Sequence, residues 1–297
     1  MFDFRLKVFH TVAKRLNFTK AAEELNITQP AVTKHIKEIE SYLKSKVFER
    51  NGTKITLTLA GETLLKYTEQ IFSIYRQLDY DINNLNERHK GTLRIGASTT
   101  VAQYILPPVL AGFHQKYKDI KVSLTIDNSE KIDLLLQQKK IDLGIVEGRS
   151  RNNMFKYTEF LKDEIVLVTN SNNELAKKAF IEIEELKEIP LLLREPGSGT
   201  LEIIAHHLKP FNIKISELNR EMQLGNSESI KAYLQHSNCF TFLSVHSVVS
   251  ELTDKRFTIV DVKDLTIERY FYFMEPQGET ASLIELFKNF AFRYNFK

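Results

Sequence analysis

Cysteine is nearly absent from this chain of 297 residues, and so are long apolar runs. Cys239 is the only cysteine, which excludes an intrachain disulfide and a cysteine-based zinc site and favours a reducing compartment. The first residues show no basic segment followed by an apolar one, and uncharged apolar stretches such as residues 105–113 are too short to span a membrane. We therefore expect a cytoplasmic protein with no membrane partner.

Glycine and proline are also scarce, at 11 and 7 residues, while 42% of the residues are hydrophobic. This composition excludes collagen-like, low-complexity and largely disordered chains. At roughly 100 to 200 residues per domain, the length predicts two domains, or one large domain with an appendage.

The chain has no strong excess of either charge overall, because its formal net charge is only +3. The distribution is uneven: residues 1–60 carry 11 Lys/Arg against 6 Asp/Glu, whereas residues 61–297 carry 30 against 32. A basic amino-terminal module on a near-neutral body predicts a polyanionic partner, and nucleic acid is the usual one.

Apolar spacing predicts three short helices in this basic segment. The second is expected to be capped by Thr19 and the third by Thr28. Opposite its buried stripe, the third helix presents amide, hydroxyl and ammonium groups: Gln29, Pro30, Thr33, Lys34 and Lys37. A helix-turn-helix inserts such a face into the major groove, where glutamine pairs with adenine and the other polar groups suit phosphates or base edges.

A hairpin is predicted directly after these helices. Residues 47–50 and 54–58 flank Asn51-Gly52, a strong turn signal, and Arg50 stands at the base of the resulting wing. The segment therefore reads as a winged helix-turn-helix. The alternative is a basic three-helix bundle whose polar face is merely solvated.

Four motifs in this segment resemble the amino-terminal signature of LysR-type transcriptional regulators. They are FTKAAE (18–23), TQPAVT (28–33), FER (48–50) and LTLAG (57–61). The resemblance implies that Gln29 and Pro30 approach bases, that Thr28, Thr33 and Lys34 hold the DNA backbone, and that Arg50 serves the wing. Lys44 departs from the family, which commonly has glycine there; a left-handed lysine would cost on the order of 1 kcal/mol.

A heptad seam follows the wing, with steps of four and three: Leu64, Thr68, Ile71, Tyr75, Leu78, Ile82 and Leu85. About thirty residues at 1.5 Å each give a helix of about 45 Å, too long for one small domain to cover. We expect residues 59–89 to dimerise, which suits an operator with two-fold-related half-sites. The alternative is packing against the same chain. The resembled family implies tetramers built from two dimers.

Residues 90–297 alternate short apolar strands with helical stretches, which predicts α/β winding on a largely parallel sheet. Two such series predict two lobes, one near residues 90–163 and 268–297 and the other near 164–267, with a ligand cleft between them. The expected strands cover residues 92–97, 121–126, 141–146, 165–169, 191–194, 221–224, 240–243 and 270–274. The expected helices cover residues 100–117, 130–138, 200–208, 228–236 and 282–294.

This part also resembles the LysR-type effector domain, a two-lobed α/β fold of periplasmic-binding-protein type, through LRIG (93–96), ILP (105–107), Phe113 and IDLGI (141–145). The segment REPGSGT (194–200) and Asn128-Ser129 further resemble the subgroup that regulates carbon fixation and sulfur assimilation. Ser237 and Cys239 stand where glycines are common, which leaves open the backbone geometry before residue 240.

Three hydroxyl-bearing segments each join a strand to the start of a helix. Unpaired amides and the helix dipole at such places favour anions. Together with Arg194, they predict a small anionic effector held by Ser98, Thr99, Thr100, Asn128, Ser129, Ser198 and Thr200. The alternative for each of these groups is an ordinary helix cap.

No catalytic constellation is present, because residues 197–199 lack a Gly-x-Ser-x-Gly elbow and no phosphate-binding P-loop occurs. His206 and His207 diverge by about 100° on a helix and make a poor metal pair. We therefore expect no enzyme, no cofactor and no metal, but a regulator bound to double-stranded DNA that works with RNA polymerase. The competing class is a solute-binding module without specific DNA recognition.

Overall fold

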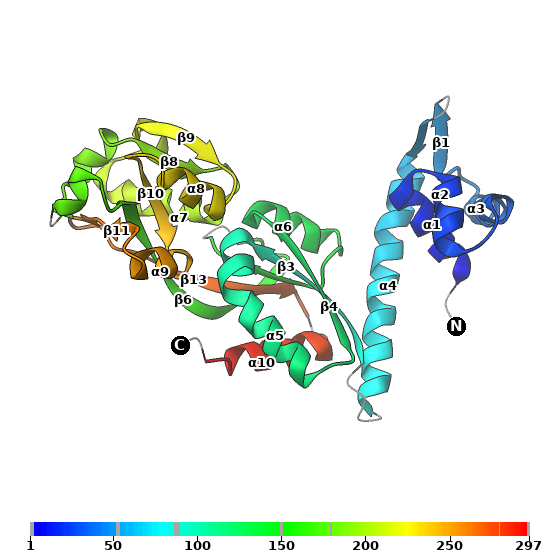
Figure 1. Cartoon of the computed structure of the whole chain (residues 1–297). Coiled ribbons are helices and arrows are strands. Elements are labelled where there is room, and N and C mark those ends of the chain that lie inside the picture. Colours follow the sequence, from blue (N-terminus) through cyan, green and yellow to red (C-terminus); the bar gives the residue numbers. More distant parts are fainter. Residues whose placement is uncertain are drawn as a thin grey trace. The chain divides into compact units, whose positions relative to one another are not determined.

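The computed structural model describes residues 3–51, 54–85, 90–148, 151–178, 180–278 and 280–295. Within it the chain forms two compact units, residues 1–78 and 79–297 (Figure 1). The first unit contains the helices α1 (Phe4–Arg15), α2 (Phe18–Leu25) and α3 (Gln29–Leu43), and the strands β1 (Phe48–Asn51) and β2 (Lys54–Leu57). The helix α4 (Leu59–Leu85) begins in this unit.

Capping side chains set where the first helices begin. Thr28 accepts a hydrogen bond from the Ala31 amide at 3.3 Å, as predicted. The prediction for Thr19 was wrong: Asn17 caps α2, because its extended backbone lets the side-chain oxygen reach the amides of Thr19 and Lys20 at 2.9 and 3.0 Å. Lys44 ends α3 with φ 51°, so the left-handed cost expected for this lysine applies.

A single apolar core joins the three helices to the predicted wing. Phe9 and Phe18 of α1 and α2 each contact Phe48 of β1, with ring centroids 5.5 and 5.7 Å apart. Asn51 pairs with Lys54, so Asn51, which was predicted to lie in the turn, is instead the last residue of β1, whereas Gly52 lies outside the described residues. The start of α4 closes the core, since Leu64 and Leu65 pack against it.

The second unit is built on a nine-stranded sheet in the order β4-β3-β5-β13-β6-β10-β8-β9, with β11 also paired to β6. Its strands are β3 (Gly91–Ser98), β4 (Ile120–Asp127), β5 (Leu143–Val146), β6 (Phe155–Asn170), β8 (Leu191–Arg194), β9 (Arg220–Leu224), β10 (Phe240–Ser244), β11 (Phe257–Ile259) and β13 (Ile267–Pro276). A small separate sheet pairs β7 (Phe180–Ile181) with β12 (Asp261–Val262).

The helices of this unit are α5 (Leu106–Lys116), α6 (Ser129–Gln137), α7 (Gly199–Leu208), α8 (Ser227–Leu234), α9 (Val245–Thr253) and α10 (Ser282–Phe292). A π-helical turn, Val101–Ile105, replaces the first part of the helix predicted from residue 100. Short 3-10 segments cover Glu174–Lys177, Ile183–Lys187, Lys209–Phe211 and Ile215–Glu217. The helix α9 was not predicted.

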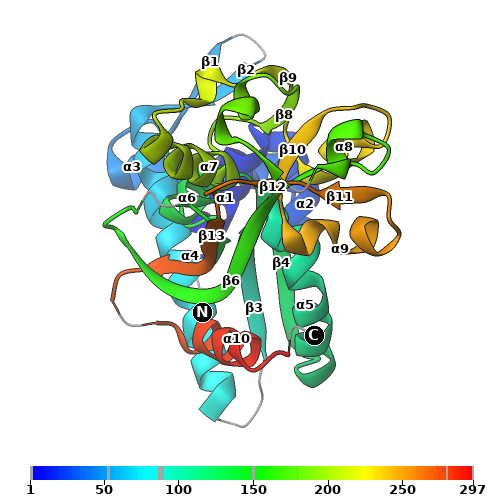
Figure 2. The same ribbon diagram turned by 90° about the vertical axis from the view of Figure 1, so that its left-hand side faces the viewer.

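Two parallel groups of strands define two lobes, each with its own core. In lobe I, β3 pairs in parallel with β4 and β5; in lobe II, β8 pairs in parallel with β9 and β10. The helix α10 returns to lobe I as predicted and lies beside β3 and α5 (Figure 2), where Phe287 meets Phe113 at 5.2 Å.

The long antiparallel pair β6 and β13 connects the lobes. In β6, Phe160 and Leu161 pack against the core of lobe I, whereas Ile165 and Leu167 belong to that of lobe II. In β13, Ile267 likewise belongs to the core of lobe II, whereas Phe271 and Phe273 belong to that of lobe I. The sheet therefore contains fewer parallel strands than predicted, because β6 and β13, which connect the two lobes, lie antiparallel at its centre.

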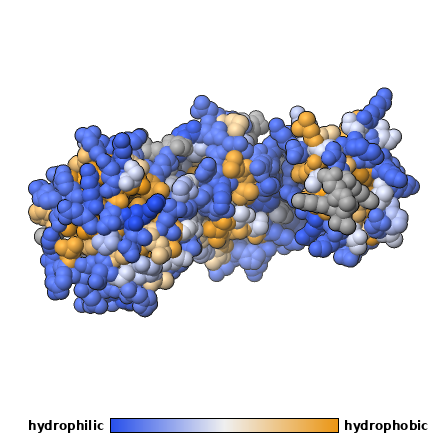
Figure 3. All heavy atoms as spheres, turned by 90° about the horizontal axis from the view of Figure 1, so that it is seen from above, coloured by the Kyte–Doolittle hydropathy of each residue, from blue (hydrophilic) through white to orange (hydrophobic). Residues whose placement is uncertain are grey.

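In the described parts of the chain, no helix is long and apolar enough to cross a membrane. Polar residues cover most of the surface seen in Figure 3, and apolar side chains form separate patches. Ser237 and Cys239 have no positive φ, so neither needs the freedom of the glycine expected there.

Candidate functional sites

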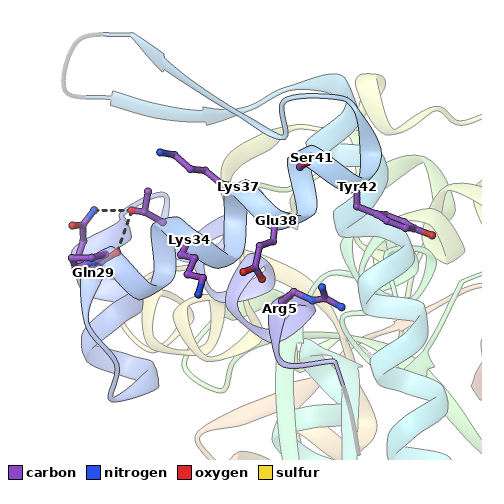
Figure 4. A pocket seen from close by; sticks show the side chains of 9 residues that line it. Arg5, Gln29, Lys34, Lys37, Glu38, Ser41 and Tyr42 are labelled. Atoms are coloured by element: carbon purple, nitrogen blue, oxygen red, sulfur yellow. Dashed lines mark hydrogen bonds between the residues drawn. The ribbon is translucent and has the colours of Figure 1, made fainter.

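One face of α3 carries the predicted polar set. Gln29, Pro30, Thr33, Lys34 and Lys37 line a shared open hollow (Figure 4). Gln29 and both lysines are exposed. The Gln29 side-chain amide donates to the Thr33 hydroxyl at 3.0 Å, and that hydroxyl donates to the backbone carbonyl of Gln29 at 3.1 Å. These bonds orient the glutamine at the start of the helix. The side chain of Arg50 lies outside the described residues.

The same hollow includes residues that the sequence reasoning did not select. Arg5 of α1 lines it together with Glu38, Ser41 and Tyr42 of α3, and Tyr42 is 87% exposed. Helical spacing from Lys34 and Lys37 could have identified the three α3 residues. Arg5 gave no local signal, because α1 and α3 meet only in the fold.

Along α4, the predicted seam divides into two parts. Leu64 packs on the core of the first unit, and Thr68 is fully buried and donates to the Leu64 carbonyl at 2.8 Å. Ile71 and Tyr75 are half-buried, while Leu78 and Ile82 are 45% and 52% exposed. The side chain of Leu85 lies outside the described residues. Contact with the same chain thus occupies the start of the seam, and an apolar surface continues beyond it.

Glu69 ties α4 to α1. Its carboxylate is 2.9 Å from the His10 ring Nε2 and 2.7 Å from the Lys14 ammonium, and its side chain is only 7% exposed. Burial by itself raises the pKa of Glu69, but the hydrogen bonds from His10 and Lys14 outweigh it and lower the pKa to about 2. The carboxylate is therefore ionised throughout the physiological range.

Between the two lobes, the fold gathers most of the predicted effector residues. Arg194 at the end of β8 donates to the Thr99 hydroxyl of lobe I at 2.9 Å. Ser98 at the end of β3 donates to the Glu147 carboxylate, and Thr200 of α7 donates to its other oxygen at 3.4 Å. All five side chains are buried, as is that of Thr100.

The amino termini of α6 and α7 meet across the same interlobe space. The Glu130 amide donates to the Gly197 carbonyl at 3.3 Å. A Cβ on Gly199 would lie 2.4 Å from the Glu147 carbonyl oxygen and 2.7 Å from the Ser129 hydroxyl oxygen, so only glycine permits this approach. The hydroxyls of Ser129 and Ser198 have no hydrogen-bond partner although both oxygens are buried.

Asn128 has the ordinary capping role, because its side chain accepts from the Lys131 amide at 3.1 Å. Ser198 occupies the same position on α7 but makes no capping bond. Its hydroxyl is thus available to a ligand, which distinguishes the two predicted caps.

Glu147 and Arg269 are central residues that the sequence reasoning missed. Arg269 of β13 donates to Thr200 at 2.9 Å and to the Asp163 carboxylate at 2.7 Å, and it lies 3.7 Å from Glu147. Glu147 follows the parallel strand β5, a position that could have identified it. Arg269 lies within an antiparallel strand, where no local pattern marks it.

Two cavities adjoin this cluster. The larger, of about 560 Å³, is lined by the first turns of α6 and α7 and by Val146, Glu147, Tyr157 and Met274. The smaller, of about 330 Å³, is lined by Gly148, Arg151, His207 and Arg269, among others. The interlobe space therefore has room for a small molecule.

The family follows from comparison with known proteins. The lysR family of bacterial regulatory helix-turn-helix proteins matches residues 4–62, and the LysR substrate binding domain matches residues 86–293. The chain therefore belongs to the LysR family. It is a DNA-binding transcriptional regulator with an effector-binding domain, and not an enzyme.

Individual relatives show where the chain lies within the LysR family. It is 28% identical to the regulator CysL of Bacillus subtilis over 95% of this chain and 94% of that one, and 30% identical to the activator CmpR of Synechocystis over 98% and 95%. The regulatory domain of Synechocystis CcmR, solved in complex with 2-PG, is 30% identical with a TM-score of 0.62, over 68% of this chain and 95% of that one. CysL, together with relatives named as RuBisCO regulators, confirms the resemblance to the carbon-fixation and sulfur-assimilation subgroup.

Proposed function

We propose that this regulator responds to a small effector with an anionic group, bound between lobes I and II. In this proposal residues 1–58 read the operator, residues 59–89 dimerise, and residues 90–297 sense the effector. The observation that carries it is the meeting of the α6 and α7 amino termini, where the hydroxyls of Ser129 and Ser198 lack partners. Helix amino termini attract anions through free amides and the dipole. The CcmR domain bound to 2-PG supports the same class of ligand.

The effector acts through the equilibrium between lobe arrangements. It shifts that equilibrium only as far as it binds one arrangement more tightly than the other. Arg194 and Thr99 form a contact between the lobes, and so do Tyr104 and Glu228. Burial and the bond to Glu228 raise the pKa of Tyr104, which keeps its hydroxyl protonated as the donor. A change in lobe closure would alter the spacing of DNA-reading heads in an oligomer.

The assembly we propose is a dimer, or a tetramer of two dimers, paired through the exposed apolar surface of α4. Tyr67, Ile74, Leu78 and Ile82 are all more than 40% exposed and recur at helical spacing. On DNA this oligomer would act in the cytoplasm through RNA polymerase. An operator with two-fold-related half-sites matches such a pair.

Selection of genomic DNA fragments by the purified protein, at stated salt, tests the DNA function. Gln29→Ala should weaken specific binding by about 1–3 kcal/mol and spare non-specific affinity. Lys34→Ala should weaken both and reduce the salt slope by roughly 0.9. Lys118→Ala removes an exposed lysine of the other unit and serves as the control. Unchanged operator discrimination in both α3 variants would place the recognition surface elsewhere.

Footprinting of the best fragment tests the effector part. Small phosphates and carboxylates from the pathways encoded beside the operator should alter the footprint. A footprint that changes only with uncharged ligands would contradict the anionic effector.

A further inference from the structure

The two buried arginines of the interlobe site are already neutralised by carboxylates. Arg194 holds Glu195 with two hydrogen bonds, at 2.8 and 3.0 Å. Arg269 is shared between two buried carboxylates, those of Asp163 at 2.7 Å and Glu147 at 3.7 Å. Together with Glu195, whose side chain is 20% exposed, the site holds three carboxylates and two guanidinium groups, although an anionic ligand alone would call for the reverse.

The Glu147 carboxylate already accepts hydrogen bonds from two of the hydroxyls that were predicted to bind the anion. It accepts from Ser98 on lobe I and from Thr200 on lobe II, and its side chain is 2% exposed. An anionic group brought to those hydroxyls would meet this carboxylate directly. A group that donates hydrogen bonds and carries positive charge would instead be stabilised there.

The larger cavity extends this negative environment. Besides Glu147, it is lined by Glu130 and Asp133 of α6, and none of the described residues that line it is a lysine or arginine. The Arg151 guanidinium lies behind this lining, 4.5 Å from the ring of Tyr157. Ser198 also lines it, is only 3% exposed, and has an unpartnered hydroxyl oxygen that can accept from a donor. An unsatisfied buried hydroxyl of this kind is expected where a ligand completes the hydrogen bonding.

We propose that the effector is zwitterionic: it carries an ammonium group, bound by Glu147 in the acidic cavity, as well as the anionic group held at the α6 and α7 amino termini. Its chemical class is an amino acid or a small amino-acid derivative. The inference rests on the proposed effector function and specifies its ligand. Glu147 is the residue that selects an ammonium over a hydroxyl at the same carbon.

Matched pairs of ligands that differ only in that group test the proposal: O-phospho-L-serine with L-3-phosphoglycerate, L-aspartate with L-malate, and L-serine with L-glycerate. Binding to the full chain is measured by calorimetry. In at least one pair the ammonium member should bind 10-fold or more tightly than its hydroxyl partner. Glu147→Gln should reduce that preference to less than 3-fold. Glu174→Gln, at a side chain that is 83% exposed, is the control and should keep the preference.

Glu147→Asp keeps the charge and covers the case in which the glutamine variant does not fold; it should retain the preference at lower affinity. Equal binding of both members, or a preference that survives in Glu147→Gln, overturns the inference but leaves an anion-responsive regulator intact. Failure of every ammonium member to bind also overturns it. If, in addition, no anion alters the footprint, the proposed effector function fails as well.

Discussion

Glu69 provides a direct test of how the helix α4 is anchored to α1 in the first unit. The structure places its pKa near 2, against an ordinary value of 4.5. A difference of about 2.5 units at about 1.36 kcal/mol each corresponds to about 3 kcal/mol of stability. Because the folded-state pKa is the lower one, this contribution is complete above pH 4.5 and is lost as the pH falls toward 2.

Glu69→Gln should therefore destabilise the first unit by about 3 kcal/mol at pH 7. Amide hydrogen exchange in α1 and α2 measures this directly, and protection should fall roughly 100-fold. Near pH 3 the difference from the unsubstituted protein should shrink to about 1 kcal/mol, because the carboxylate is then largely protonated in the unfolded state while it is still mostly ionised in the folded one. Rates are compared after correction for intrinsic exchange.

Glu62→Gln is the matched control, since this glutamate lies on the same helix but is exposed. It should leave protection unchanged at both pH values. If Glu69→Gln exchanges no faster than Glu62→Gln, the ion pairs with His10 and Lys14 do not stabilise the head, and our account of the anchoring is wrong.

Three further changes test the backbone, the interlobe contact and the assembly. Lys44→Gly should stabilise the first unit by about 1 kcal/mol in the same exchange assay, because it removes a lysine from the left-handed conformation. Asn26→Gly is the control: Asn26 has φ 55°, but asparagine tolerates this conformation, so the gain in stability should be smaller. An equal gain in stability for both variants would contradict the explanation. Gly199→Ala should lower the stability of the second unit by about 1–3 kcal/mol in thermal unfolding, because its Cβ meets the Glu147 carbonyl; Gly225→Ala, with no atom within 4 Å, should have no such effect. Leu78→Asp should shift sedimentation at micromolar concentration from dimer to monomer, and a persistent dimer would exclude the α4 surface as the interface.

Much of the DNA-binding head could be predicted from the sequence, because its determinants are local. Helical periodicity, the Thr28 cap and the polar face beginning at Gln29 all depend on residues within a few positions of each other. The one wrong cap shows the limit of that reasoning. Thr19 and Asn17 are both good capping residues, and only the backbone direction before α2 decides that Asn17 fills the role.

The strands that join the lobes were only partly predictable. Residues 155–164 carry many charged side chains and break the apolar–polar alternation typical of a strand, so the long strand β6 was recognised only from residue 165, where its apolar run begins. Pairing with β13, more than a hundred residues later, stabilises the polar half.

By itself, the sequence determined the family, the basic helix-turn-helix and the alternation of strands and helices, because motifs, charge and periodicity are properties of neighbouring residues. Only the tertiary structure decided the charge of the interlobe site. Glu147, Asp163 and Arg269 are distant in sequence, yet they share one buried cluster beside Ser98 and Thr200. Which ionic groups neutralise one another depends on distances that only folding sets.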